Sequence, residues 1–155
     1  MTEVSPTIEC IRSASRLLVR ELGFMGGDFA GTELSPSAVH ALIEIGASPG
    51  ITARRLGDLL RLEKSSISRM LRKLVLSGDV LEQADTDDSR MKKLFLTEAG
   101  RERASAIHSF ANSQVAHALE RLAPGEDRTV ALRDFVSMPK LLPQMPTALR
   151  FPRPR

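Results

Sequence analysis

The clearest pattern of hydrophobic and polar positions lies between residues 65 and 75. Apolar side chains recur there at spacings of three and four residues, as on one face of an α-helix; they are Ile67, Met70, Leu71, Leu74 and Val75. The opposite face of this predicted helix carries hydroxyls and cations, namely Ser65, Ser66, Ser68, Arg69, Arg72 and Lys73. A helix of this kind buries one side and presents groups that can contact phosphates and base edges in a DNA groove.

Three further helices are predicted before this basic helix. The first covers about residues 7–22 and is followed by a loop rich in glycine. The second begins at residues 35–36, where serine is a good N-cap and proline a good first residue, and it ends before residues 48–50, Ser-Pro-Gly. The third begins after Thr52, which can cap it, and buries Ala53, Leu56 and Leu60. A turn near residues 62–63 then leads into the basic helix.

The pattern changes from helical spacing to short strands after the glycine at position 78. Residues 80–83 and 93–96 are predicted to form two strands, joined by the charged and turn-rich segment 85–90. The segment from Glu82 to Lys93 holds four acidic and three basic residues, a net charge of −1. We therefore expect a small hairpin with a polar tip.

Helices are predicted again in the C-terminal part. Thr97 can cap a long helix over about residues 98–122, and a last helix covers about residues 130–138. The apolar stripe of the long helix exceeds what a monomer of this size can bury. We therefore expect the first helix, the long helix and the last helix to pack against a second copy; ordinary intrachain core is the alternative. Residues 143–155 combine prolines and arginines without acids, and we expect an extended or disordered basic tail.

Composition limits the class of protein. A chain of 155 residues that is 42% hydrophobic and 26% charged is typical of one globular domain. No apolar run approaches the roughly 18 residues that span a membrane, and the first residues lack the pattern of a signal peptide. The single cysteine, Cys10, excludes an internal disulfide. We expect a cytoplasmic protein.

Charge is distributed unevenly along the chain. Residues 1–50 hold three basic and six acidic residues, whereas residues 54–73 hold seven basic and two acidic ones. A basic patch confined to one segment is typical of a face that binds nucleic acid, although a solvated helix face has the same composition. Tyr and Trp are absent, which disfavours stacking of single-stranded bases on aromatic side chains. Duplex DNA is the favoured partner.

Little in the sequence indicates catalysis. The three histidines, His40, His108 and His117, have no spacing typical of a zinc site. The glycine-rich loop follows a helix rather than a strand, unlike a phosphate-binding fingerprint. The acidic segment 85–90 lacks the central glycine and late glutamate of a calcium loop. We expect no enzyme activity, no cofactor and no metal.

The ordered series of motifs resembles the MarR family of bacterial winged-helix transcription regulators. The resemblance rests on the third helix, the basic helix, the charged hairpin and the run from Leu94 to Gly100, and it covers about residues 8–140. It implies a mainly α-helical fold with a small β-hairpin wing. In the implied organisation a single domain spans residues 1–142, with a winged helix-turn-helix part at about 34–97 and dimerisation helices at about 5–24 and 98–142.

The resemblance also implies a function and a set of binding residues. Regulators of this family are homodimers that place one recognition helix per half-site of a pseudo-palindrome. By position, the DNA-facing residues of that helix are Ser65, Ser66, Ser68, Arg69, Arg72 and Lys73. Thr52 is implied to touch phosphate, and Arg90 to enter a minor groove with Asp88 holding its orientation. The first strand of the hairpin lacks the arginine that this family often has in it, and the hairpin has a net negative charge. We therefore expect the recognition helix to contribute more to DNA binding than the wing does.

The leading expectation is a transcriptional repressor that a small hydrophobic effector releases from DNA. Several alternatives remain open beside it. In some MarR-like regulators a cysteine near the start of the first helix senses peroxides with the help of tyrosines; Cys10 has a similar place, but the chain has no tyrosine. A protein with the same fold can instead act as an interaction module or antirepressor. The N-terminal half is also similar to MarR-type domains fused to acetyltransferases, so a severed domain of such a fusion is a further alternative.

Overall fold

The computed structural model describes residues 6–24, 29–85, 91–121 and 129. By its internal contacts the chain divides into two units, residues 1–113 and 114–155. The described elements are α1 (Pro6–Glu21), α2 (Pro36–Ala47), β1 (Ile51–Thr52), α3 (Ala53–Leu60), α4 (Lys64–Leu76), β2 (Val80–Ala84), β3 (Lys92–Leu96) and α5 (Glu98–Glu120). No helix within these described ranges is long and apolar enough to cross a membrane.

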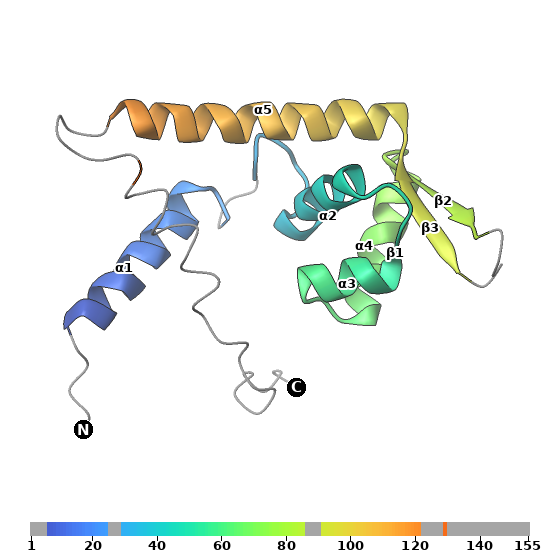
Figure 1. Cartoon of the computed structure of the whole chain (residues 1–155), viewed down its shortest axis with the longest axis horizontal. Helices are drawn as coiled ribbons and strands as arrows, with labels where there is room; N and C mark the ends of the chain where they lie inside the picture. Colours follow the sequence, from blue (N-terminus) through green and yellow to red (C-terminus); the bar gives the residue numbers. More distant parts are fainter. Residues whose placement is uncertain (1–5, 25–28, 86–90, 122–128, 130–155) are drawn as a thin grey trace, which may run out of the picture. The chain divides into compact units, whose positions relative to one another are not determined.

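A three-stranded antiparallel sheet lies beside the three short helices α2, α3 and α4 (Figure 1). Its strand order is β1-β3-β2, with Ile51 opposite Leu94 and Val80 opposite Leu96. The hairpin of β2 and β3 was expected from the sequence, whereas β1 was not, because two residues are too short to show an alternating pattern. The mainly helical architecture with a small sheet is as expected.

One hydrophobic core holds the elements of the first unit together. Its fully buried side chains come from every layer: Val39, Leu42 and Ile45 of α2, Leu56 of α3, Leu74 of α4, Leu94 of β3 and Ile107 of α5. Because each helix contributes one apolar stripe and the sheet contributes one face, the core fixes α4 against α2, α3 and the sheet.

Local signals in the sequence place the helix starts correctly. The hydroxyl of Ser35 accepts from the Ala38 amide at 3.4 Å, that of Thr52 from the Arg55 amide at 3.2 Å, and that of Thr97 from the Gly100 amide at 3.0 Å. Each hydroxyl satisfies one of the amides that a helix start leaves without an intrahelical acceptor. The three predicted N-caps are therefore confirmed.

Some expectations about burial were wrong. Val75 was expected on the buried stripe of the basic helix but is 38% exposed, because it lies at the edge of that stripe where α4 leaves the core. Ala53 and Leu60 are only half-buried, and the buried residues of α3 are Leu56 and Gly57. The buried positions of α4 are Ile67, Met70, Leu71 and Leu74, as expected.

The helices assigned to dimerisation behave differently from the core helices. No residue of α1 is buried. In α5, Ala104 and Ile107 are buried, but Phe110 and Val115 further along are 39% and 56% exposed. The predicted helix over 130–138, the tail over 143–155 and the tip of the wing over 86–90 lie outside the described residues.

Candidate nucleic-acid interface

The candidate interface is carried by two helices, α3 and α4, and by the turn between them. The backbone amide of Arg61 donates to the Asp58 carbonyl at 3.3 Å, and that of Leu62 donates to the Gly57 carbonyl at 3.0 Å. These two bonds form the Schellman arrangement that closes a helix and reverses the chain. The turn is therefore short and hydrogen-bonded, and α4 begins three residues after Arg61.

The two faces of α4 separate as the sequence predicted. Its four core residues are at most 8% exposed, whereas the exposed face carries five of the six expected binding residues: Ser65, Ser68, Arg69, Arg72 and Lys73. The sixth, Ser66, is half-buried. A rigidly packed helix thus holds hydroxyls and cations in solvent, in the arrangement that suits phosphates and base edges.

Two residues of the candidate interface have specific backbone contacts. Nε of Arg69 donates to the Ser65 carbonyl at 3.3 Å, one turn earlier on α4. Thr52 is half-buried and uses its hydroxyl oxygen to cap α3. Because a hydroxyl accepts and donates at once, the Thr52 proton can still be offered to a phosphate.

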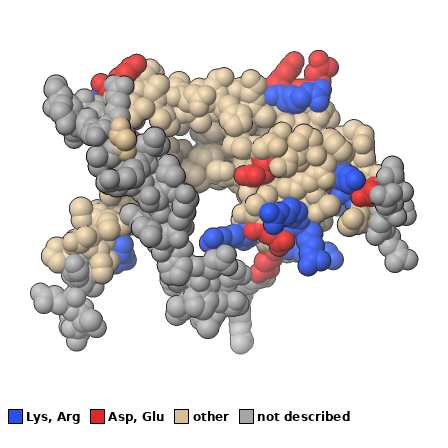
Figure 2. Space-filling view, viewed as in Figure 1, with Lys and Arg blue, Asp and Glu red and all other residues tan. Residues whose placement is uncertain are grey.

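Basic and acidic side chains are mixed on the surface of the helix-turn-helix. On the face drawn in Figure 2, Lys and Arg lie over the α3 region, with acidic atoms among them. A groove of about 750 Å³ lies between α3, α4 and β2, and its charged lining consists of Arg54, Asp58, Lys64, Arg72 and Glu82. The surface is therefore positive on balance but contains two carboxylates, which limits where a phosphate can approach.

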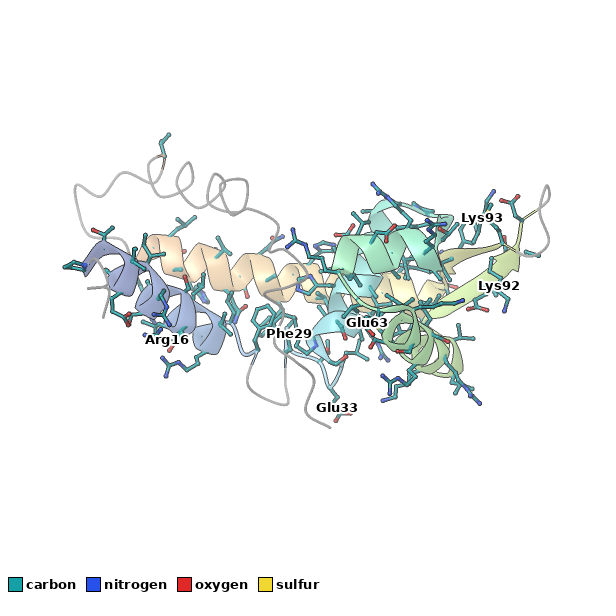
Figure 3. The ribbon with its side chains drawn as sticks, turned by 90° about the horizontal axis from the view of Figure 1, so that it is seen from below. Arg16, Phe29, Glu33, Glu63, Lys92 and Lys93 are labelled. Atoms are coloured by element: carbon teal, nitrogen blue, oxygen red, sulfur yellow. The ribbon has the colours of Figure 1, made fainter. Side chains whose placement is uncertain are left out.

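Lysines of the wing are already paired with acids. Nζ of Lys92 lies 2.7 Å from a carboxylate oxygen of Glu82, and Nζ of Lys93 lies 3.1 Å from one of Asp85. The two lysines leave opposite sides of β3, as neighbouring strand residues do (Figure 3). Both pairs neutralise the arms of the hairpin. Asp88 and Arg90, the expected wing-tip contacts, lie outside the described residues.

A buried carboxylate that the sequence analysis did not single out joins α4 to α5. The side chain of Asp79 is 1% exposed, accepts from the Ser77 hydroxyl at 2.6 Å and lies 3.3 Å from a guanidinium nitrogen of Arg103. The hydroxyl of Thr97 also donates to the Gly78 carbonyl at 2.6 Å. These contacts tie the end of the candidate recognition helix to the start of the long helix.

The remaining chemically notable side chains lie apart from this surface. Cys10 is exposed on α1, where its neighbour Glu9 pairs with both Arg12 and Arg16 at 3.4 and 3.2 Å. His40 lies against the rings of Phe24 and Phe29, with centroids 6.2 and 6.0 Å away. No group of three potential metal ligands occurs among the described residues.

The fold and the exposed polar face of α4 define a winged helix-turn-helix protein. Residues 34–92 match the family model described as MarR family. Over these residues the chain is similar to this family of transcriptional regulators.

A curated relative is also a helix-turn-helix regulator. The uncharacterized HTH-type transcriptional regulator YybA of Bacillus subtilis (strain 168) is 25% identical over 92 residues, which are 54% of this chain and 61% of YybA. The match thus spans less than two thirds of that relative.

Solved structures share the fold over most of the chain. Streptococcus pneumoniae FabT in complex with DNA has a TM-score of 0.71 and 17% identity, covering 86% of this chain and 93% of FabT. A mutant of S. aureus MepR has a TM-score of 0.73 and 18% identity, covering 86% of this chain and 97% of that one. A crystal structure of MarR has a TM-score of 0.58 and 25% identity, covering 84% and 88%.

Proposed function

We propose that this protein is a homodimeric repressor that binds a pseudo-palindromic operator in double-stranded DNA and is released by a small hydrophobic effector. The observation that carries the proposal is the face of α4, where Arg69, Arg72 and Lys73 are exposed while the opposite side is locked into the core. The structural likeness to FabT, which was crystallised with DNA, supports the same use of the fold.

The proposed DNA contact of each residue follows from the chemistry of its side chain and from its position on the fold. Arg69 and the serines Ser65, Ser66 and Ser68 read base edges from the N-terminal half of α4, because recognition helices use their N-terminal residues for this. Arg72 and Lys73 contact phosphates, and so does Thr52 from the start of α3. Arg90 enters the minor groove with Asp88 as its carboxylate partner.

The dimeric state is proposed from α1 and α5. Both helices carry exposed apolar side chains in the single chain, including Ile11, Leu17 and Val115, and a second copy would cover them. Within this arrangement residues 34–97 form the DNA-binding part, and about 5–24 and 98–142 form the dimerisation part. Two recognition helices related by a two-fold axis explain the need for a pseudo-palindromic site.

The experiment that tests this function is selection of binding sites from randomised duplex DNA with the full-length protein. We expect an enriched site with two inverted half-sites about 10 base pairs apart, bound with an affinity that falls steeply with salt. The matched control replaces Arg69, Arg72 and Lys73 together by alanine, which keeps the buried face of α4 intact. Failure to enrich any duplex, combined with a salt-insensitive protein complex, would instead identify an interaction module.

The effector part of the proposal has a separate test. Small hydrophobic molecules are screened for compounds that raise the unfolding temperature of the protein and release it from the selected DNA. A compound that stabilises the protein must bind the folded state. Stabilisation without release from DNA would remove the effector from the proposal and leave the DNA-binding part standing.

A further inference from the structure

The turn between α3 and α4 contains an arginine in a conformation that favours glycine. Arg61 has φ 52° and ψ 40°, which is the left-handed helical region. A Cβ atom crowds the following carbonyl oxygen in that region, so L residues other than glycine and asparagine rarely occupy it. The residue at this point of a Schellman motif is usually glycine for the same reason.

The chain uses glycine at two other turns of the winged-helix part where φ is positive. Gly50, which precedes β1, has φ 88°, and Gly78, which follows α4, has φ 79°. In the part of the chain that the structure describes, Ala30 and Arg61 are the residues other than glycine with positive φ. Position 61 therefore carries a conformational cost that glycine would remove, and a strained residue of this kind indicates a role for its side chain.

The surroundings of Arg61 indicate what that role is. Its side chain is exposed, and no described carboxylate forms an ion pair with it. It lies in the segment with the largest excess of basic residues, three positions before the first residue of α4. Three residues span at most about 11 Å, so the Cα atom of Arg61 lies no further than that from the first residue of the proposed recognition helix.

We propose that Arg61 contacts a phosphate of the DNA backbone beside each half-site, and that its strained conformation is retained for this contact. The proposal rests on the proposed DNA-binding function. In a helix-turn-helix the first helix crosses the backbone while the second enters the major groove, so a cation in the turn between them faces phosphates rather than base edges. A guanidinium group suits a phosphate because it can donate two parallel hydrogen bonds.

This assignment makes stability and DNA binding change in opposite directions. Arg61→Gly and Arg61→Asn relieve the backbone strain, and we expect each to raise the unfolding temperature of the free protein by a few degrees. Both variants lose the phosphate contact, so the slope of log affinity against log salt should fall by about 0.9 for each lost contact, and by about 1.8 for a dimer on two half-sites. The preferred base sequence should stay the same.

Three controls separate the contributions of charge, strain and position. Arg61→Lys keeps both the positive charge and the strain, and should keep the salt slope. Ala30→Gly relieves strain at the other non-glycine position with positive φ, and should leave DNA binding unchanged. Arg12→Gln removes one exposed cation from α1, where its ion pair contributes little, and should leave the slope unchanged.

The measurements are thermal unfolding of the free protein and DNA affinity across a salt series with the selected operator. An unchanged slope in Arg61→Gly and Arg61→Asn would overturn the proposal, and so would lower thermal stability of both variants. A change of preferred bases would show that Arg61 reads sequence instead. If the wild-type protein binds no duplex DNA, the proposed function itself fails, which is a different result from an unchanged slope.

Discussion

Arg69 is the exposed residue of α4 whose contacts best suit it to read a base. Its Nε bonds the Ser65 carbonyl at 3.3 Å, and this bond involves neither terminal nitrogen of the guanidinium group. Two parallel donors of a guanidinium can pair with the O6 and N7 atoms of guanine, the commonest specific contact in the major groove. The bond to α4 holds the side chain along the helix, in the direction of Ser65.

We predict that Arg69→Ala weakens binding to the selected operator by roughly 1–3 kcal/mol and relaxes preference at one position of each half-site. Arg90→Ala, at the wing tip, should instead weaken binding mainly where the flanking DNA is rich in A·T pairs. The measurement is competition binding over randomised half-sites and flanks for both variants. If Arg69→Ala keeps the preferred sequence while Arg90→Ala abolishes it, the wing and not α4 determines specificity.

Among the described glycines, Gly100 has the least room for a side chain. A Cβ atom added there would fall on the backbone carbonyl oxygen of Asp79, an atom that cannot move without shifting the backbone between α4 and β2. We predict that Gly100→Ala lowers the free energy of unfolding by about 1–3 kcal/mol, because it overpacks backbone against backbone. Urea unfolding measures this change.

Gly46 provides the matched control for this prediction. A Cβ atom there would lie 3.1 Å from Cδ1 of Leu96, the end of a flexible side chain. Replacing a glycine by alanine inside a helix also gains up to about 1 kcal/mol, so Gly46→Ala should be nearly neutral. Equal effects of the two substitutions would show that helix propensity, and not the contact with Asp79, determines the result.

Two elements, α4 and α5, are connected by the buried carboxylate of Asp79. Arg103 of α5 is its charged partner at 3.3 Å, and the Arg103 side chain is 42% exposed while that of Asp79 is 1% exposed. The ion pair therefore combines one fully desolvated group with one that solvent still reaches. Removing the arginine leaves the buried charge with fewer compensating contacts.

We predict that Arg103→Met destabilises the protein by about 1–3 kcal/mol. Asp79→Asn removes the buried negative charge, so combining it with Arg103→Met should cost less than the sum of the two single changes. The measurement is a double-mutant cycle by urea unfolding. Additive effects would mean that Asp79 and Arg103 contribute to stability independently and that the link between α4 and α5 lies elsewhere, for example in Thr97.

Features of these helices can be predicted from the sequence when the residues that determine them lie close together along the chain. The caps at Ser35, Thr52 and Thr97 are readable because each involves an amide only three residues away. The exposed face of α4 is readable because the helical spacing of its apolar residues defines the opposite side. Most of the candidate interface is therefore predictable from one short segment.

The features that escape prediction depend on contacts between distant segments. Strand β1 exists because Ile51 and Thr52 pair with Leu94 and Lys93, more than forty positions later. The burial of Asp79 depends on Arg103 and on the start of α5, and in the sequence an aspartate after a glycine is typical of an exposed turn. The backbone strain at Arg61 cannot be predicted either, since no residue pattern predicts an arginine in the left-handed helical region.

For the whole molecule, α1 raises a question of stability. Its 16 residues have no buried side chain, and its large apolar residues are 41–54% exposed. Isolated helices of about this length are marginal in water, and helices in proteins gain most of their stability from packing an apolar face. In the proposed homodimer, a second copy of the chain covers the apolar side chains of α1 and so stabilises this helix.

We predict that Ile11→Glu and Leu18→Glu, two turns apart on one face of α1, convert the dimer to a monomer. Each would place an unpaired carboxylate in the interface, which should weaken dimerisation at least about 100-fold. Ser13→Glu, on the opposite face, is the matched control and should leave the dimer intact. Sedimentation at micromolar concentration measures the association state, and circular dichroism checks that the winged-helix part remains folded.

The same variants test whether DNA binding needs both copies. If one recognition helix binds each half-site, a folded monomer should lose most of its preference for the complete operator over a single half-site, because the second contact no longer acts at a high effective concentration. A wild-type protein that sediments as a monomer would remove the dimer from the proposed function. A monomeric variant that binds the complete operator as tightly as the wild type would show that α1 mediates association without contributing to recognition.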